Sequence, residues 1–174
     1  MTRINKVRMT AFLGLMLAIV IVLSVLESML PQIPLLPPNF RIGLSNIVTM
    51  YCAIFISKTQ AVTLNALKSV FVLMTRGPVA GLLSFCGGML SILILILLLY
   101  AFKDRISYIA LSCAGAVAHN LGQFIALLFI LDMGLFVYYL PFSLIAGILM
   151  GLLTGALLRF ILPALERIAR PFGR

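Results

Sequence analysis

Long apolar segments, separated by short polar breaks, fill most of this chain. The first runs from about Met9 to Leu30, enough to cross about 30 Å of hydrocarbon at about 1.5 Å per residue. The chain is 63% hydrophobic and 10% charged, whereas a soluble domain has about 25% charged residues. Because one soluble core could not bury so many apolar side chains, the sequence predicts an all-α, polytopic membrane protein. Residues 1–174 are expected to form a single membrane domain.

The polar breaks divide the chain into six predicted membrane spans. Their approximate bounds are Met9–Leu30, Ile42–Ile56, Ala61–Thr75, Val79–Phe102, Tyr108–Leu131 and Tyr138–Leu162. The second and third are near the short limit for a crossing, so tilt, local thinning or irregular ends are expected there. The loop PQIPLLPPN, residues 31–39, carries four prolines and cannot continue the first helix.

The basic residues indicate how the chain is oriented. The formal net charge is +9, but the charges lie mainly at segment ends, where they are topology signals rather than a nucleic-acid surface. Arg41 and Arg76 fall on one side, and Lys68 lies within a span. The other ten basic residues share the side of the termini: Arg3, Lys6, Arg8, Lys58, Lys103, Arg105, Arg159, Arg167, Arg170 and Arg174. The sequence therefore predicts that both termini are cytoplasmic.

Two predicted spans carry small residues on one face, where another helix can approach closely. In the first span these are Ala11, Gly14 and Ala18, and this face could pack within the protein or against a partner. In the last span they are Gly147, Gly151 and Gly155. For the last span an internal contact is favoured over one with another chain.

The stretch GAVAHNLGQ, residues 115–123, is unusually polar for the middle of an apolar segment. Polar side chains at such depth are costly and are functional candidates by default. The polar residues predicted to lie within or beside the spans are Glu27, Arg41, Asn46, Asn65, Lys68, Arg76, His119, Asn120 and Gln123. In the third predicted span, Asn65, Lys68 and Val72 share one helical face.

Two interpretations of these residues remain open. In one, Asn120 and Gln123 are interhelical hydrogen-bonding groups worth about 0.6 to 2 kcal/mol each, and His119 is neutral. In the other, the side chains line a solute cavity open to the outside. A charged Lys68 within a span costs about 2.5 to 3.5 kcal/mol, so either Glu27 or an anionic ligand must offset it. The excess of basic groups favours an anionic or partly anionic solute.

Several chemistries find no support in the sequence. The four acidic residues (Glu27, Asp104, Asp132 and Glu166) are scattered, so no pair is expected to hold a magnesium–diphosphate centre. One histidine and three cysteines in apolar segments (Cys52, Cys86 and Cys113) do not form a zinc-binding pattern. A phosphate-binding GxxxxGK[ST] loop and a Ser-His-Asp arrangement are also absent. We therefore expect no cofactor, no metal site, no catalytic residue and no enzymatic activity of its own.

Three stretches carry a resemblance to a known family: RIGLSNIVTM (residues 41–50), GAVAHNLGQ and YYLP (residues 138–141). With the glycine-rich last span, they are similar to the bacterial membrane family named "Gx transporter" or "heptaprenyl diphosphate synthase component I". The chain also resembles the substrate-binding S-components of energy-coupling factor (ECF) transporters. The resemblance implies a six-helix bundle in a bacterial cell membrane, whose outer half holds one small, vitamin- or precursor-like solute beneath the first loop.

The resemblance also implies partners and a set of site residues. An S-component of an ECF-type ABC importer works with a membrane T-component and two cytoplasmic ATPases, which it meets through a small-residue face of its first helix. Gly14 and Ala18 occupy the matching positions, with Ala11 on the same face. The expected solute-binding residues are Arg41, Asn46, Lys68, Arg76, His119, Asn120 and Gln123. The alternative that the family name implies is a membrane accessory subunit of heptaprenyl diphosphate synthesis.

Overall fold

A computed structural model describes residues 3–29, 43–102, 105–130 and 133–169, and this part of the chain is helical, with no strand. Its elements are α1 (Arg3–Met29), α2 (Asn46–Tyr51), η1 (Cys52–Ile56), α3 (Lys58–Arg76), α4 (Pro78–Phe102), α5 (Tyr108–Leu128) and α6 (Met133–Ala169). The expected all-α class is confirmed for these residues. Arg41 and the proline-rich loop lie outside them.

Four of the described helices are long and apolar enough to cross a membrane. The candidate spans are Met9–Met29 within α1, all of α4, all of α5, and Leu140–Pro163 within α6. Each helix also exposes large apolar side chains, for example Val22, Leu97, Ile125 and Leu149. Apolar side chains that cover much of a helix surface are what hydrocarbon favours and water opposes. The helices therefore belong to a membrane protein, as the composition predicted.

The second and third predicted spans do not meet the same criteria. α2 and η1 form one short apolar helix, Asn46–Ile56, well under the roughly 20 residues that a crossing needs. η1 is a π-helical turn, which the Ser57 amide closes by donating to the Cys52 carbonyl at 2.9 Å. α3 has 19 residues but contains Lys58, Lys68 and Arg76. The structure thus supports four spans, and a count of six stays a prediction.

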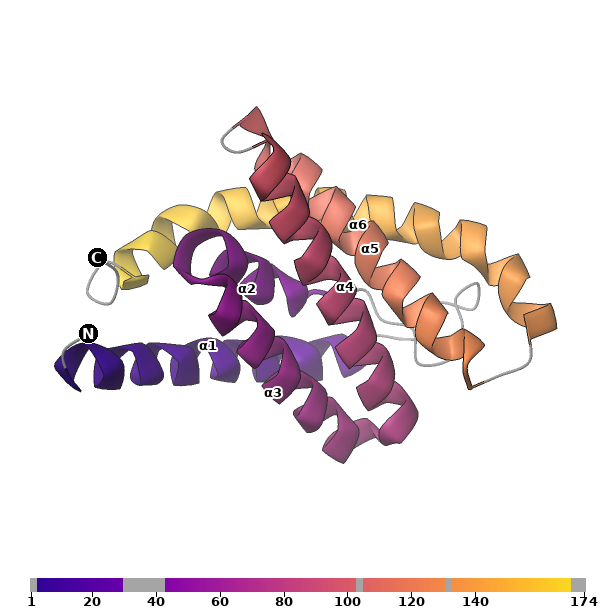
Figure 1. Ribbon diagram of the computed structural model, residues 1–174, viewed down its shortest axis with the longest axis horizontal. Helices are drawn as coiled ribbons and strands as arrows, with labels where there is room; N and C mark the ends of the chain where they lie inside the picture. The colour runs from indigo at the N-terminus through magenta and orange to yellow at the C-terminus, as the bar shows by residue number, and fades with distance from the viewer. Residues whose placement is uncertain (1–2, 30–42, 103–104, 131–132, 170–174) are drawn as a thin grey trace.

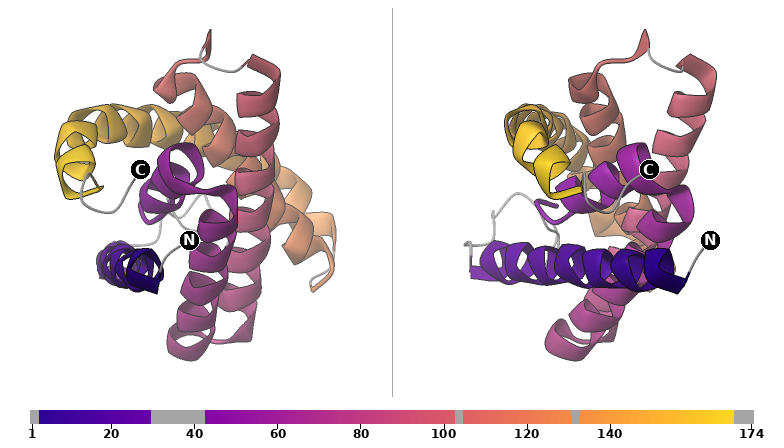
Figure 2. Two further views of the ribbon diagram at one scale, coloured as in Figure 1. Left: turned by 60° about the vertical axis from the view of Figure 1, so that its left-hand side comes forward. Right: turned by 90° about the vertical axis from the view of Figure 1, so that its left-hand side faces the viewer.

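Figure 1 shows how the helices are arranged. α3, α4, α5 and α6 pack in chain order, each against the next, while α1 contacts α2 and α3. Figures 1 and 2 show that α1 crosses α3 and α4 steeply instead of running alongside them. α2 contacts every other α-helix, so this short helix occupies the centre of the molecule. The start of α1 and the end of α6 lie on the same side (Figure 1).

Turns between the helices follow from local sequence. Gly77, with φ of +90°, ends α3, and its amide donates to the Leu73 carbonyl at 3.1 Å. Pro78 then opens α4, where a missing N–H costs nothing. The Ser107 side chain caps α5 by accepting from the Ala110 amide at 3.1 Å. Gly77 and Pro78 thus join α3 to α4 through a tight turn, and Ser107 defines the start of α5.

The glycine face of the last span packs inside the molecule. A Cβ added at Gly155 would lie 2.9 Å from the Ile109 Cα, and one added at Gly147 would lie 2.8 Å from the Asn120 Nδ2. Gly151 meets the backbone of Cys113 in the same way. All three neighbours belong to α5. The favoured interpretation, an internal contact of α6, is therefore confirmed, and it fixes α5 between α4 and α6.

We expect Gly122→Ala to destabilise the protein more than Gly14→Ala. An alanine Cβ at Gly122 in α5 would lie 2.6 Å from the Cys86 carbonyl oxygen and 2.9 Å from the Gly87 Cα in α4. Backbone atoms yield little, and overpacking of this kind costs about 1 to 3 kcal/mol. No described atom lies within 4 Å of a Cβ at Gly14. Thermal unfolding in detergent should separate the two variants by several degrees, and equal midpoints would contradict the α4–α5 contact.

Candidate functional site

A small cavity lies in the middle of the molecule, where α1, α3, α4 and α5 meet the segment before α2. Its volume is about 20 Å³, which is room for about one water molecule. We call it the central cavity. Its lining residues are Ser24, Glu27, Gly43, Ser45, Lys68, Val72, Arg76, Ala80, Ser84, His119 and Gln123. Most of them are polar or charged, although the helices that carry them are largely apolar.

α1 brings a carboxylate to this cavity. Its buried face begins with apolar side chains, among them Met16 and Val20, and ends with Ser24 and Glu27. The Glu27 carboxylate accepts a hydrogen bond from the Gly43 amide. Gly43 has φ of +85°, a conformation that side chains other than glycine rarely adopt. The turn at Gly43 therefore depends on glycine, and it aims a backbone donor at the carboxylate.

α3 supplies a buried lysine opposite that carboxylate. Lys68 is 4% exposed, and its Nζ donates to the Asn46 Oδ1 at 2.7 Å. Lys68 and Glu27 line the same cavity, and their opposite charges attract each other. The carboxylate thus offsets part of the cost of burying the ammonium group. The sequence left two ways to offset the charge of Lys68, which were Glu27 or an anionic ligand. The structure places Glu27 in the same cavity as Lys68.

Arg76 adds a second cation to the cavity. It lies at the end of α3, and its Nη2 donates to the Ser24 carbonyl and lies 3.5 Å from the Ser24 Oγ. These contacts tie the end of α3 to α1 across 52 positions in the chain. The described cavity lining therefore has two cationic side chains and one carboxylate. This balance favours a ligand or ion with negative charge.

α5 contributes His119 and Gln123, which are one helical turn apart and 3% and 2% exposed. Gly87 in α4 makes room for them, because a Cβ there would lie 2.8 Å from the His119 Cε1 and 2.9 Å from the Gln123 Cγ. Among the described residues, four buried side-chain atoms have no hydrogen-bond partner: Ser45 Oγ, Asn65 Oδ1, His119 Nδ1 and Gln123 Oε1. Buried polar atoms are normally satisfied, and the three that belong to the cavity lining, on Ser45, His119 and Gln123, favour a polar molecule there.

A second small cavity, also about 20 Å³, adjoins the first. The two share Gly43 and His119, so the imidazole lies between them. The residues that line the second cavity are Gly43, Asn46, Ile47, Met50, Ser91, Ser112, Gly115, Ala116, His119 and Thr154. The stretch GAVAHNLGQ therefore contributes to both cavities. Together they form a polar region that reaches from α1 to α6.

The structure brings five of the seven predicted binding residues to this polar region. These are Asn46, Lys68, Arg76, His119 and Gln123. Asn120 lines neither cavity, since its Nδ2 donates to the Ser143 carbonyl of α6 at 2.6 Å; it holds two helices together, as the first interpretation expected. Arg41 lies outside the described residues.

Sequence reasoning missed the small members of the lining, which include Ser24, Gly43, Ser45 and Ser84. Serine and glycine are common in membrane helices and give little signal alone. Of these residues, Ser24 is the one that the sequence could have predicted, because it lies one helical turn before Glu27. The sequence marks Glu27 as a possible offset for the charge of Lys68 and not as a binding residue, yet Glu27 lines the cavity.

The predicted docking residues lie on the opposite side of α1 from the cavity. Ala11, Gly14 and Ala18 are all exposed, and a Cβ at Gly14 would meet no described atom within 4 Å. Within the described part of the chain, this small-residue face is not used for packing. It is available to another helix.

The part of the chain that the structure describes contains no set of residues suited to binding a metal ion. No group of three or more His, Cys, Asp or Glu residues there could hold a metal ion. Cys52, Cys86 and Cys113 are free thiols that lie on separate helical elements. What the site can do chemically is to hold a small polar or anionic molecule by hydrogen bonds and charge.

Comparison with known sequence families gives a match over most of the chain. The sequence family described as heptaprenyl diphosphate synthase component I matches residues 16–161. That range includes every described residue of the two cavities. No curated protein and no solved structure matches the chain.

Proposed function

The chain belongs to the heptaprenyl diphosphate synthase component I family, and on that premise we propose that it is a solute-binding membrane component of an ECF-type ABC importer. Its solute is a small anionic or partly anionic molecule of the vitamin or precursor class. Asn46, Lys68, Arg76, His119 and Gln123 bind it, with Arg41 and Asn120 as the remaining candidates. The chain itself performs no catalysis.

The observation that carries this proposal is the cluster of charged and polar side chains inside apolar helices. Lys68, Glu27, His119 and Gln123 are each at most 4% exposed. Membrane proteins keep such groups mainly where substrates or ions pass. Three of the four buried polar atoms without described partners belong to the cavity lining, and they supply hydrogen-bonding capacity that a solute would use.

The central cavity is too small to hold a solute, so solute binding requires a conformational change. About 20 Å³ is far below the roughly 300 to 1,000 Å³ of ordinary small-molecule sites. The structure would therefore correspond to a closed state. α1 is the element to move, because it supplies Glu27 and Ser24 yet its main contacts among the described helices are with α2 and α3. Its displacement would separate Glu27 from Lys68 and leave the ammonium group for the solute.

The proposal includes a topology and an assembly. Six crossings, with α2–η1 and α3 as short or tilted spans, place both termini in the cytoplasm of a bacterial cell membrane. The exposed Ala11, Gly14 and Ala18 face then docks a membrane T-component, which carries the cytoplasmic ATPases. Figure 1 supports termini on one side, because the start of α1 and the end of α6 lie on the same side of the molecule.

The description of the matched family favours a second candidate function. In this alternative, the chain is a membrane accessory subunit of heptaprenyl diphosphate synthesis. It would associate with a soluble prenyl synthase and change the chain length of its product. Affinity capture from membranes separates the two functions: ATPases and a T-component support the importer, and a prenyl synthase supports the accessory subunit.

Lys68→Met is expected to weaken solute binding about tenfold, the loss of one charge-assisted hydrogen bond. The solute would first be identified by mass spectrometry of small molecules that co-purify with the chain in detergent. Its affinity would then be measured by titration calorimetry. Lys58→Met is the matched control, because Lys58 is exposed at the start of the same helix. Unchanged affinity in a folded Lys68→Met variant would refute the site.

A further inference from the structure

The second cavity differs from the central cavity in its charge. The central cavity contains Lys68, Arg76 and Glu27. Among the described residues that line the second cavity there is no lysine, arginine, aspartate or glutamate. Besides His119, which borders both cavities, its polar side chains are uncharged hydroxyl and amide groups, on Asn46, Ser91, Ser112 and Thr154. The two cavities therefore suit different chemical groups.

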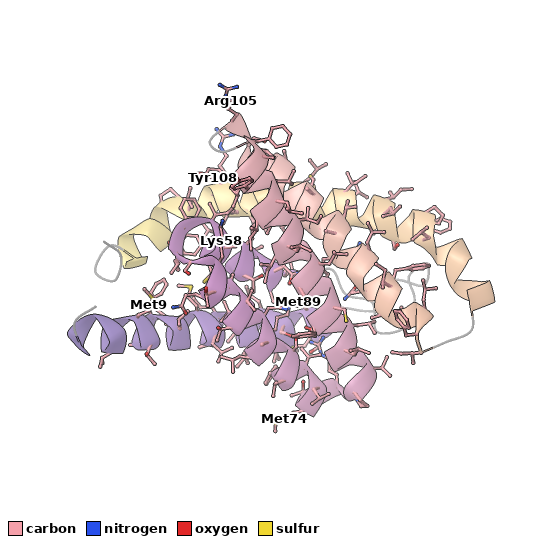
Figure 3. All side chains as sticks on the ribbon, viewed as in Figure 1. Met9, Lys58, Met74, Met89, Arg105 and Tyr108 are labelled. Atoms are coloured by element: carbon pink, nitrogen blue, oxygen red, sulfur yellow. The ribbon has the colours of Figure 1, made fainter. Side chains whose placement is uncertain are left out.

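The polar groups of the second cavity lie deep inside the molecule. Ser91 is near the middle of α4, and Ser91, Ser112 and Thr154 are all buried. Figure 3 shows Met89, two residues before Ser91, between Met74 at one end of the molecule and Arg105 at the other. Polar groups at such a depth in a membrane protein need polar partners. The contents of this cavity are therefore expected to be polar.

The hydroxyl pair of Ser112 and Thr154 provides an acceptor in the lining. The Thr154 Oγ1 lies 2.7 Å from the Met150 carbonyl oxygen and 2.7 Å from the Ser112 Oγ. A hydroxyl group has one proton, and a carbonyl oxygen can only accept. Thr154 therefore donates to Met150 and accepts from Ser112. The Ser112 Oγ has then used its proton, and it keeps a lone pair that can accept from a ligand.

Asn46 provides a donor in the same lining. Its Oδ1 accepts from the Lys68 Nζ at 2.7 Å, and because an ammonium group can only donate, the amide presents its Nδ2 on the other side. Gly43 makes room for this Nδ2, since a Cβ there would lie 2.8 Å from it. Asn46 thus contacts the cation of the central cavity and also lines the second cavity. A solute needs only a short spacer to reach both.

Glu27 indicates which anion the central cavity accepts. Its carboxylate lines the same cavity as the Lys68 ammonium group, and the two groups attract each other. The cavity therefore already accommodates a carboxylate together with the lysine. When α1 moves away, the Glu27 carboxylate leaves with it. A carboxylate of the solute, which has the same charge and shape, can then take its place.

We propose that the second cavity binds a hydroxyl group, so that the solute is a hydroxy acid with its carboxylate at Lys68 and its hydroxyl group between Asn46 and Ser112. This inference rests on the proposed solute-binding function. A hydroxyl group both donates and accepts, which matches the Ser112 acceptor and the Asn46 donor. The volume of about 20 Å³ has room for one group of the size of water. An ammonium group would meet no acidic side chain in the described lining, so amino acids are disfavoured.

Ser112→Ala is a clean variant of this subsite. It removes the acceptor, while Thr154 keeps its hydrogen bond to the Met150 carbonyl, so no hydroxyl proton is left unpaired. Ser143→Ala is the matched control. Ser143 is also buried, its Oγ donates to the Leu140 carbonyl at 2.8 Å, and it lines neither cavity. Thermal unfolding would establish that both variants fold.

The experiment uses the full chain in detergent with two probes, glycerate and propionate, which share a carbon skeleton and differ in their hydroxyl groups. Affinities would be measured by saturation-transfer NMR titration, which detects weak ligands. We expect glycerate to bind about tenfold more tightly, because its hydroxyl group makes two hydrogen bonds that propionate lacks. Ser112→Ala should lower this preference to about threefold, the value of the one remaining bond, without changing propionate binding. Ser143→Ala should keep the full preference.

The outcomes separate this inference from the importer proposal. Equal affinity for the two acids, or an unchanged preference in a folded Ser112→Ala variant, would overturn the hydroxyl subsite. No binding of either acid would exclude small hydroxy acids and would overturn it as well. In each case the solute site itself is judged by Lys68→Met, which should weaken the binding of any carboxylate or of the co-purified solute. Ligand binding that is indifferent to Lys68→Met would refute the solute site instead.

Discussion

Glu27→Leu is expected to lower the free energy of unfolding by about 3 to 5 kcal/mol, the usual cost of removing one partner from a buried charge pair. Glu27 is 3% exposed, and its carboxylate accepts from the Gly43 amide. Its charge also stabilises Lys68 across the central cavity. The leucine variant buries the ammonium group without that compensation. Thermal or denaturant unfolding in detergent would measure the loss.

Two further variants show whether the charge itself is responsible. In Glu27→Leu combined with Lys68→Met, both charges are absent, so the double variant should recover much of the lost stability. Ser28→Leu is the matched control: it makes the same new side chain at the next position, on the exposed side of α1, and should change stability little. Additive costs of the two single variants would show that Glu27 and Lys68 do not interact.

The long helices were predictable because apolar length carries most of the information about a membrane span. α1, α4, α5 and α6 contain the four longest predicted segments. α1 ends, and α4 and α5 begin, within one residue of the predicted bounds, whereas α6 extends beyond the predicted Tyr138–Leu162 at both ends. The short second span was harder. Asn46–Ile56 is apolar, but its location at the centre of the molecule depends on contacts with every other α-helix, which no local pattern records.

Residue type predicted which residues belong to the site better than it predicted which way each side chain points from its helix. Intramembrane Lys68, His119 and Gln123 stood out because polar groups are rare there, and helical spacing put His119 and Gln123 on one face. Asn120 stood out equally, yet it turns towards Ser143 of α6. Consecutive residues on a helix point about 100° apart, so type alone does not decide which of them faces a cavity. That choice depends on where α4 and α6 pack.

Gly43 shows why the rest of the site escaped sequence reasoning. Its role rests on a positive φ and on an amide that points at Glu27, sixteen residues earlier. Neither property has a signature within RIGLSNIVTM, where glycine is one of several small residues. Ser45 reaches the cavity through the same turn. Loop residues of this kind enter a site through tertiary geometry. The charged residues of the site can be recognised from the sequence, because charged side chains are costly and therefore rare in membrane-spanning segments.

Gly14→Leu is expected to reduce uptake to background while leaving the fold and solute binding intact. The importer proposal assigns the Ala11, Gly14 and Ala18 face to partner docking, and close approach of two membrane helices requires small residues. No described atom lies within 4 Å of a Cβ at Gly14, so leucine fits within this chain. It would clash only with a partner helix. Uptake of labelled solute by cells, and capture of the ATPases, would measure the loss.

The docking prediction concerns where the leucine is introduced, so the control introduces a leucine at another exposed helical position. Ala156→Leu places a leucine at an exposed position of α6, off the proposed face, and should transport as the parent does. Loss of uptake and of ATPase capture only in Gly14→Leu, with unchanged thermal stability, would locate the partner on α1. If both variants transport normally, the α1 face is not the docking surface. If the parent captures a prenyl synthase instead of ATPases, the exposed face serves the accessory function.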